Sequence, residues 1–361
     1  MRILQLGKFY PPDFGGIETL MQDICDALSQ RGIVCDVLCS NSKLQSKKEK
    51  TPYGATIYRT PSFGKVASTS ITPQMITTLR KLISSYDIIH LHFPDPMAVL
   101  ALFLSPHKNK TIILHWHSDI IKQKFLLNFF LPLQKWILNR SNLIITTSEN
   151  YIHQSPFLSP YKNKCIAIPI GIHLPEISPS NNYSKDYNRI LSVGRLVPLK
   201  GFEYLIESLQ YLPKNFYLEI VGDGIYKQTL QDLIKRLNLQ NRVFLVGKKT
   251  KEEISSFYAQ SGIFVLPSLQ ESYGIVLVEA LSFGLPIIST KLIPSGSDFI
   301  NQDGKTGLVV PPKDPRAIAN SILKISKNYD FFSINARCRY EKLFTKNQMI
   351  QTLVDTYHKL I

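Results

Sequence analysis

The chain has 361 residues, which is more than one compact core usually holds and enough for two domains. Hydrophobic residues make up 44% and charged residues 19%, and this balance excludes an intrinsically disordered chain. The formal net charge is +15 and is spread over both halves, which suits an acidic membrane surface or a phosphorylated substrate. We expect no nucleic-acid partner, because the sequence has no zinc finger, RNP motif or base-reading basic helix.

The five cysteines are scattered and form no CxxC pair, so we expect free thiols in a reducing compartment and no metal site. The opening residues, Met1 to Gly7, form too short an apolar run for a signal peptide and are typical of a buried strand. No run reaches the roughly 18 apolar residues of a membrane span. These features favour a cytoplasmic protein, free or resting on the inner face of the membrane.

Short apolar runs alternate with amphipathic stretches through the first half. We expect strands at 3–6, 34–39, 88–92, 111–115, 143–147 and 165–168, with helices such as 18–29 and 134–139 between them. A stretch rich in Pro, Ser and Asn, 174–186, interrupts this pattern and is the best linker candidate.

The alternation restarts after the linker. Strands are expected at 189–193, 217–221, 243–246, 263–266, 286–289 and 307–310, helices at 202–210, 227–237, 251–260 and 273–282, and helix throughout 315–361. Strand–helix alternation predicts parallel sheets covered on both faces. The predicted fold is α/β, with two Rossmann-like doubly wound domains facing a cleft, at 1–175 and 186–340. A C-terminal helix at 341–361 is expected to pack back on the first domain.

Three motifs follow strand ends and carry chemistry. Gly15 and Gly16 precede the first helix, where backbone can approach an anion, although a plain strand-to-helix turn fits equally well. Arg195 and Lys200 follow the strand at 189–193 and could clamp a diphosphate, or could be two solvated cations.

Glu271 and Glu279 form the third and strongest motif. Glu271 is expected on the loop before a helix that starts near Gly274, and Glu279 about two turns inside that helix. The free N–H groups of Gly274, Ile275 and Val276 would bind a phosphate. Because Glu279 falls in an apolar run, where an unpaired carboxylate is costly, a functional partner is favoured.

Together, Glu271-x7-Glu279 with Gly274, Gly194-Arg195…Lys200-Gly201 and Gly15-Gly16-x-Glu18 resemble the retaining GT-B glycosyltransferases of family 4 over almost the whole chain. The resemblance implies that Gly15 and Gly16 approach the donor, that Arg195 and Lys200 hold its diphosphate, and that Glu271 binds hydroxyls of its sugar. It also implies that Glu279 binds the ribose, that His117 contacts the donor sugar near the reaction centre, and that the loop at Gly222 lies beside the nucleotide. For Gly222 a tight turn is nearly as good an interpretation.

A narrower resemblance concerns 115–121 and 297–304, which are similar to bacterial enzymes that add mannose to lipopolysaccharide O-antigen chains. It implies a hexosyltransferase with GDP-mannose as donor. One departure is that relatives often carry Gly-Gly and Pro-Glu after the strand at 286–289, whereas this chain has Ile293-Pro294-Ser295-Gly296-Ser297-Asp298. Contacts drawn from that loop are therefore in doubt.

The expected reaction moves a sugar from a nucleotide-sugar donor to a hydroxyl of a glycan or lipid-linked acceptor, with retention at the anomeric carbon. Fixed positive groups would stabilise the leaving diphosphate, so we expect neither a metal nor a cofactor. A UDP-sugar-dependent transferase of the same fold is the main alternative. An epimerase, a phosphorylase, a non-catalytic binding scaffold and a nicotinamide-dependent oxidoreductase fit less well, the last because no GxGxxG occurs.

The segment from Lys122 to Arg140 joins lysines to an aromatic apolar run. It could lie on an anionic membrane and position a lipid-linked acceptor. A core-facing helix with exposed lysines explains the same pattern equally well.

Overall fold

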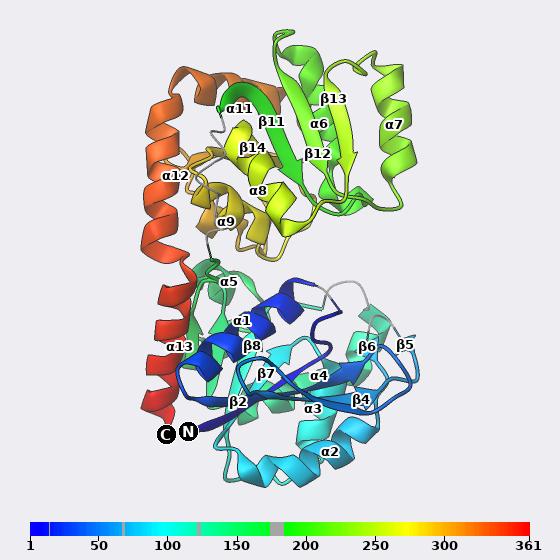
Figure 1. Ribbon diagram of the computed structural model, residues 1–361, viewed down its shortest axis with the longest axis vertical. Coiled ribbons are helices and arrows are strands. Elements are labelled where there is room, and N and C mark those ends of the chain that lie inside the picture. The colour runs from blue at the N-terminus through cyan, green and yellow to red at the C-terminus, as the bar shows by residue number, and fades with distance from the viewer. Residues whose placement is uncertain (14, 67–68, 121–123, 174–183) are drawn as a thin grey trace. The chain divides into compact units, whose positions relative to one another are not determined.

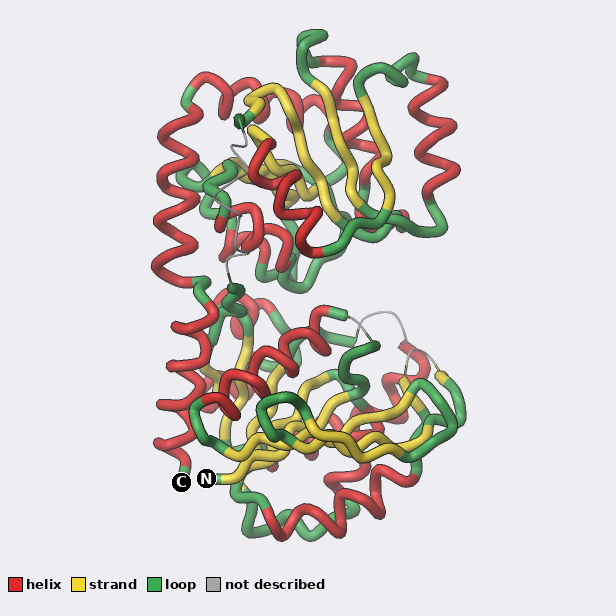
Figure 2. The backbone as a smooth tube through the Cα atoms, in the orientation of Figure 1, coloured by secondary structure: helices red, strands yellow, loops and turns green. Residues whose placement is uncertain are grey.

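The computed structural model describes residues 1–13, 15–66, 69–120, 124–173 and 184–361. The chain forms two compact units: unit 1 comprises Met1–Ile170 and Met349–Ile361, and unit 2 comprises Gly171–Gln348. Each unit contains a sheet that is wholly or largely parallel, with helices on both faces (Figures 1 and 2). The predicted α/β fold of two doubly wound domains with C-terminal helices is confirmed. The predicted linker lies mostly outside the described residues.

The sheet of unit 1 has eight strands in the order β10-β9-β8-β7-β1-β2-β4-β3. Its strands are β1 (Arg2–Gly7), β2 (Val34–Asn41), β3 (Lys47–Lys50), β4 (Thr56–Pro61), β7 (Ile88–Phe93), β8 (Thr111–Trp116), β9 (Leu143–Thr146) and β10 (Cys165–Ala167). A separate two-stranded ribbon pairs β5 (Lys65–Val66) with β6 (Thr69–Ser70). All pairs in the large sheet are parallel except β3 with β4.

Helices cover both faces of this sheet. One face packs against α2 (Gln74–Leu82), α3 (Pro96–Phe103) and α4 (Lys124–Arg140) through a core that includes Leu4, Leu91 and Trp116. On the other face lie α1 (Gly16–Gln30) and α13 (Lys346–Leu360), as Figure 1 shows. The short helix α5 (Glu149–Gln154) follows β9. Because successive strand residues point to opposite faces, each strand contributes to two separate cores.

The sheet of unit 2 has six parallel strands in the order β13-β12-β11-β14-β15-β16. They are β11 (Asp186–Val193), β12 (Tyr217–Val221), β13 (Val243–Gly247), β14 (Ser261–Leu266), β15 (Ile287–Thr290) and β16 (Gly307–Val310). One face packs against α6 (Phe202–Ser208), α7 (Lys227–Arg236) and α11 (Pro315–Lys327). The remaining helices are α8 (Lys251–Gln260), α9 (Ile275–Ser282), α10 (Ser297–Ile300) and α12 (Tyr329–Leu343).

Three details differ from the sequence-based expectation. The last two strands of the sheet, β4 and the edge strand β3, were not predicted, and the charged sequence of β3, Lys-Lys-Glu-Lys, has no apolar alternation. The predicted helix at 134–139 is the end of the longer α4. The segment 315–361 is not helical throughout but forms three helices, which break at Asn328 and at Phe344–Thr345. At the second break, the hydroxyl of Thr345 accepts a hydrogen bond from the backbone N–H of Gln348.

Candidate functional site

Three loops of unit 2 follow the carboxyl ends of neighbouring strands β12, β11 and β14, and they carry the predicted donor-binding residues. The loop after β11 is hydrogen-bonded to the loop after β12, since the N–H of Gly194 donates to Val221 O and that of Leu196 to Asp223 O, each at 3.0 Å. Ligands of open α/β sheets bind at this edge. The order of the strands thus brings motifs from distant parts of the sequence together.

Gly222 allows the loop after β12 to lie directly against the loop after β11. Its φ is +148°, and a Cβ at this position would lie 1.9 Å from the carbonyl oxygen of Gly194. A side chain is therefore excluded both by conformation and by space. From the sequence, Gly222 could belong either to a tight turn or to a loop beside the nucleotide. In the structure, Gly222 allows the loop after β12 to contact the loop after β11. Arg195, on the loop after β11, is exposed to solvent.

Lys200 and Glu271 meet although 71 residues separate them. The loop after β11 packs on the loop after β14, where a Cβ on Gly201 would lie 2.3 Å from Pro267 O and the N–H of Leu269 donates to Leu199 O at 2.8 Å. Lys200 Nζ then lies 2.5 Å from Glu271 Oε2, with both side chains less than a fifth exposed. A cation and a carboxylate thus share one partly buried position at the sheet edge.

The helix after Glu271 begins directly after Gly274, close to the start that the sequence predicted. Gly274 is the N-cap of α9 with a φ of +87°, so the first N–H groups of the helix, on Ile275 and Val276, have no carbonyl partner within it. Such a helix end favours an anion. Glu271 precedes this end and Glu279 lies in the second turn behind it.

Glu279 accepts a hydrogen bond from the hydroxyl of Tyr258 on α8, at 2.8 Å from Oε2. Tyr258 is fully buried, and burial together with the Glu279 carboxylate raises its pKa far above the usual range. The hydroxyl therefore stays protonated and holds the carboxylate of the partly buried Glu279 in place. Tyr258 could not be identified from the sequence, because a tyrosine near the end of an amphipathic helix is typical of an ordinary core residue.

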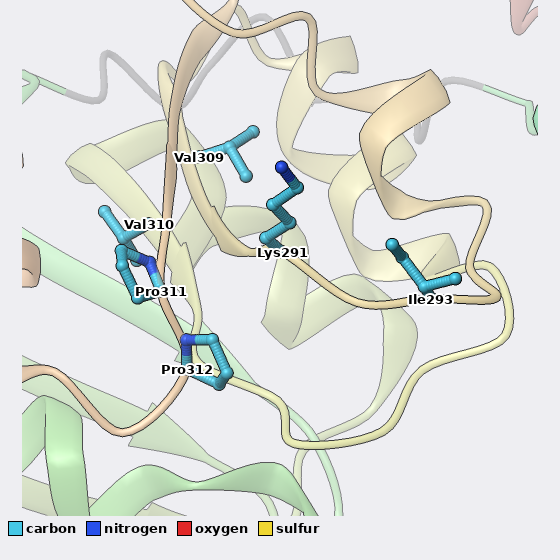
Figure 3. A pocket seen from close by; sticks show the side chains of 6 residues that line it. All are labelled: Lys291, Ile293, Val309, Val310, Pro311 and Pro312. Carbon is cyan, nitrogen blue, oxygen red and sulfur yellow. The ribbon is translucent and has the colours of Figure 1, made fainter.

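A shallow hollow of about 570 Å³ lies beside these loops, at the ends of β15 and β16. Figure 3 shows its lining: Lys291, Ile293, Val309, Val310, Pro311 and Pro312. Ile293 belongs to the segment 293–298, in which this chain departs from the family pattern. This segment contacts the glutamate loop, since the N–H of Gly296 donates to Ser272 O at 2.8 Å.

The predicted residues of unit 1 also follow strand ends. His117 comes directly after β8, and its N–H donates to Phe93 O at 3.0 Å. The turn behind it is fixed by Asp119, whose carboxylate accepts from Trp116 Nε1 and from Ser155 Oγ, each at 2.9 Å. Burial lowers the pKa of His117 to about 3, so the ring is neutral at physiological pH. Gly15 is the N-cap of α1 and Gly16 its first residue.

A histidine cluster that was not predicted from the sequence lies next to His117. His90, His92 and His115 are buried, and one ring nitrogen of each lies within 4.8 Å of the others. These nitrogens could hold a metal ion by their chemistry. Most of them already take part in hydrogen bonds, however: His90 Nδ1 with the Tyr357 hydroxyl, His90 Nε2 with His115 Nδ1, and His92 with His117 and Gln5. The alternating histidines of 90–92 and 115–117 were the available signal.

The proposed membrane segment falls mostly on α4, whereas residues 122 and 123 lie outside the described part of the chain. In the second half of α4, Trp136 stacks edge-on against Phe103 and His107, and Ile137 and Leu138 are buried. That half therefore faces the core. Among the described residues, no helix combines the length and the apolar character that crossing a bilayer requires.

Comparison with known proteins places this geometry in a family. Residues 14–174 match the model described as Glycosyltransferase Family 4, and residues 175–342 match Glycosyl transferases group 1. The O-antigen chain mannosyltransferase C of Escherichia coli is 30% identical over 373 residues, covering 100% of this chain and 99% of the relative. The D-rhamnosyltransferase WbpZ of Pseudomonas aeruginosa is 30% identical over 96% of this chain and 92% of its own.

Solved structures share the fold. The Anabaena protein HepE in complex with UDP has a TM-score of 0.79 at 20% identity and is matched over 100% of both chains. A sucrose-phosphate synthase from Thermosynechococcus elongatus has a TM-score of 0.78 at 22% identity, over 99% of this chain and 98% of the other. Two parallel α/β units of the GT-B fold, the two family matches and the full-length relatives lead to one conclusion: the chain belongs to the glycosyltransferases of family 4 and group 1.

Proposed function

We propose that this glycosyltransferase moves a hexose, with mannose from GDP-mannose as the first choice, to a hydroxyl of a glycan or lipid-linked acceptor during O-antigen synthesis, with retention at the anomeric carbon. The two relatives that are 30% identical over nearly their full lengths support the pathway and the sugar class, because one is a mannosyltransferase of O-antigen chains and the other a D-rhamnosyltransferase.

The observation that carries the proposal is the meeting of Lys200, Glu271 and the amino end of α9 at one edge of the sheet. A nucleoside diphosphate needs positive groups and free N–H donors, and a sugar needs carboxylates that accept from its hydroxyls. Lys200, Arg195 and the N–H groups of Ile275 and Val276 supply the first set. Glu271 would supply the second, and Glu279, which accepts a hydrogen bond from Tyr258, would accept another from a ribose hydroxyl.

Transfer makes the diphosphate a leaving group, on which negative charge grows as the bond to the anomeric carbon breaks. Fixed donors that are already oriented toward this charge lower the barrier without reorganising. In this proposal Lys200 leaves Glu271 for the diphosphate when the donor binds, and Glu271 turns to the sugar. His117, neutral and buried, would contact the sugar from unit 1. The protein itself supplies the positive charge, so the proposed reaction involves neither a metal nor a cofactor.

The acceptor and the place of action belong to the same proposal. A lipid-linked acceptor would bring the enzyme to the cytoplasmic face of the membrane, where the basic segment from Lys122 could rest on anionic lipid. Flotation with vesicles that contain or lack anionic lipid tests this part, and binding that ignores lipid charge would contradict it.

Ligand-induced stabilisation tests the donor. The thermal midpoint of the purified protein is measured with GDP, UDP, ADP and NAD, beside Lys200→Ala, Glu279→Ala and a control, Glu341→Ala. A ligand that binds only the folded state stabilises it by about 2.7 kcal/mol at a hundredfold excess over its dissociation constant. The control removes the ion pair of Arg337 with Glu341 on α12, 2.6 Å apart, which has no role in the proposal.

A shift with GDP that both site variants lose and the control keeps supports a GDP-sugar donor. A shift with UDP alone replaces mannose by a UDP-sugar, and a shift with NAD alone overturns the proposal. The anomeric configuration of the product, read by NMR, decides retention independently, since an inverted product contradicts it.

A further inference from the structure

Strand alternation places a row of polar rings on one face of the unit 1 sheet. On β7, Ile89, Leu91 and Phe93 face the core under α2 and α3, so His90 and His92 face the opposite side, toward α1 and α13. On β8 the same alternation puts His115 on that side, followed by His117. The register pairs His92 with His115 and Gln5 of β1 with His90. Buried polar side chains on one face must satisfy one another.

The orientation of the Gln5 amide is determined by the backbone. Gln5 Nε2 lies 3.1 Å from the carbonyl oxygen of Met21 on α1, and a carbonyl can only accept a hydrogen bond. The amide nitrogen must therefore point to Met21, which leaves Gln5 Oε1 facing His92 Nε2 at 2.9 Å. Gln5 itself is fully buried, so water does not compete for either atom.

This orientation fixes the proton on His92. Since Gln5 Oε1 can only accept, His92 Nε2 must carry the proton, and in a neutral ring His92 Nδ1 is then an acceptor. Its neighbour is His117 Nε2 at 3.0 Å, which must in turn donate. Burial lowers the pKa of both histidines below the usual value, which keeps both rings neutral.

We propose that Met21 O, Gln5 and His92 form a hydrogen-bond relay that holds His117 in the tautomer protonated at Nε2, so that Nδ1 presents a lone pair for a hydroxyl of the bound sugar. The group that binds Nδ1 should be a hydroxyl, because the nitrogen lone pair accepts a hydrogen bond from O–H and repels the oxygens of phosphate and carbonyl groups. Gln5 and His92 are positioning residues for His117. The sugar-binding part rests on the proposed function, whereas the relay stands on the geometry alone.

A metal centre at the three histidines competes with this interpretation. It would need unprotonated nitrogens that point at one ion, but His92 Nε2 must keep its proton for Gln5, and His92 Nδ1 already accepts from His117. A bound ion would have to displace these bonds. Added Zn²⁺ therefore distinguishes the two interpretations.

The tautomer is measured by NMR on protein labelled with ¹⁵N at histidine, because protonated and unprotonated ring nitrogens resonate far apart. His117→Gln assigns the signal. We expect the wild-type His117 to be protonated at Nε2, and the Gln5→Met and His92→Leu variants to show loss of that single state. His92→Asn is the rescue, since its amide oxygen can take the place of Nδ1 as the acceptor. His90→Asn is the control: it changes a stacked neighbour whose ring centroid lies 4.7 Å from that of His92, outside the relay.

Kinetics supply the second readout. Losing one hydrogen bond worth about 1 kcal/mol corresponds to about a fivefold change, so kcat/KM for the sugar donor should fall about fivefold in Gln5→Met and His92→Leu and recover in His92→Asn. The dissociation constant of the free nucleoside diphosphate should not change, because that ligand lacks the sugar hydroxyl.

Protonation of His117 at Nδ1 would overturn the relay, as would an Nε2 signal unchanged in Gln5→Met and His92→Leu, or displacement of the His92 signals by one equivalent of Zn²⁺. If the wild-type His117 is protonated at Nε2 as expected but His117→Gln keeps full transfer activity, only the role of His117 in the proposed function is overturned. The two failures are thus distinguishable.

Discussion

Lys200 Nζ lies 2.5 Å from Glu271 Oε2, so the cation proposed for the diphosphate is paired with the carboxylate proposed for the sugar. We expect the removal of Lys200 and the removal of Glu271 to affect donor binding differently. Removing a hydrogen bond to a charged group costs about 1.5–3 kcal/mol, so Lys200→Ala should weaken nucleoside diphosphate binding about tenfold or more.

Glu271→Ala should behave differently, because it frees Lys200. We expect it to bind the nucleoside diphosphate as tightly as the wild type or more tightly, while sugar transfer is lost. Isothermal titration calorimetry measures the first quantity and product formation the second. Equal loss of diphosphate affinity in both variants would show that the pair acts as one structural unit and not as two ligand-binding groups.

Tyr258→Phe should loosen Glu279 without changing its charge. The hydroxyl contributes one hydrogen bond of 2.8 Å, so we expect about 1 kcal/mol lower stability and about fivefold weaker binding of the nucleotide. Tyr217→Phe is a matched control, because Tyr217 also donates to a carboxylate at 2.8 Å, that of Asp186 at the other end of β11. If both variants reduce nucleotide affinity equally, the effect comes from general destabilisation of unit 2.

Gly222→Ala should disrupt the junction of the loops that follow β11 and β12. The new Cβ would meet Gly194 O and the residue would keep a positive φ, so we expect a loss of stability well above 1 kcal/mol together with loss of nucleotide binding. Gly304→Ala separates the two causes: its φ is +72° but nothing lies within 4 Å of a Cβ there. It should cost only the roughly 1–2 kcal/mol of the left-handed conformation and leave nucleotide affinity unchanged. Urea denaturation and calorimetry measure the two quantities.

The histidine cluster should make the protein sensitive to mild acid. Burial lowers the pKa of His90 and His117 to about 3, and it lowers the pKa of His92 and His115 well below the ordinary value of 6.5. Because the unfolded chain binds these protons near pH 6.5 and the folded chain does not, the stabilising contribution is complete above pH 6.5. It falls as the pH decreases toward about 3, by up to about 1.4 kcal/mol per pH unit for each histidine.

Comparison of the wild type with His115→Leu separates the contribution of the histidine to the pH dependence of stability from that of the carboxylates. Burial raises the pKa of Asp95 to about 6, and a raised carboxylate pKa acts in the opposite direction, favouring the folded state as the pH falls. The difference between the two proteins cancels that contribution. Between pH 6.5 and 4.5, the free energy of unfolding from urea titrations should fall less steeply in His115→Leu than in the wild type. Parallel slopes would mean that His115 is protonated in the folded protein.

The sequence predicted most features that depend on local pattern, namely the positions of strands and the starts of helices. Short apolar runs located nearly all the parallel strands, and Gly274 before an apolar helical run located the start of α9. It could not predict contacts set by strand order, such as Lys200 with Glu271, because the neighbourhood of β11 and β14 is a property of the sheet and not of either segment. The relay through Gln5 and His92 depends similarly on the register between β1, β7 and β8 and on the carbonyl of Met21 in α1.

Unit 1 is built from both ends of the sequence, and this has a consequence for how the protein is made. Met349, Ile350, Leu353 and Tyr357 of α13 are buried, and the hydroxyl of Tyr357 meets His90 Nδ1 in the sheet interior at 2.6 Å. While a ribosome synthesises residues 171–348, the first 170 residues have their strands, the helices of one face and α1 on the other face, but they lack α13. We therefore expect unit 2, whose residues are consecutive, to complete its core first, and the earlier-made half of the protein to be the later to close.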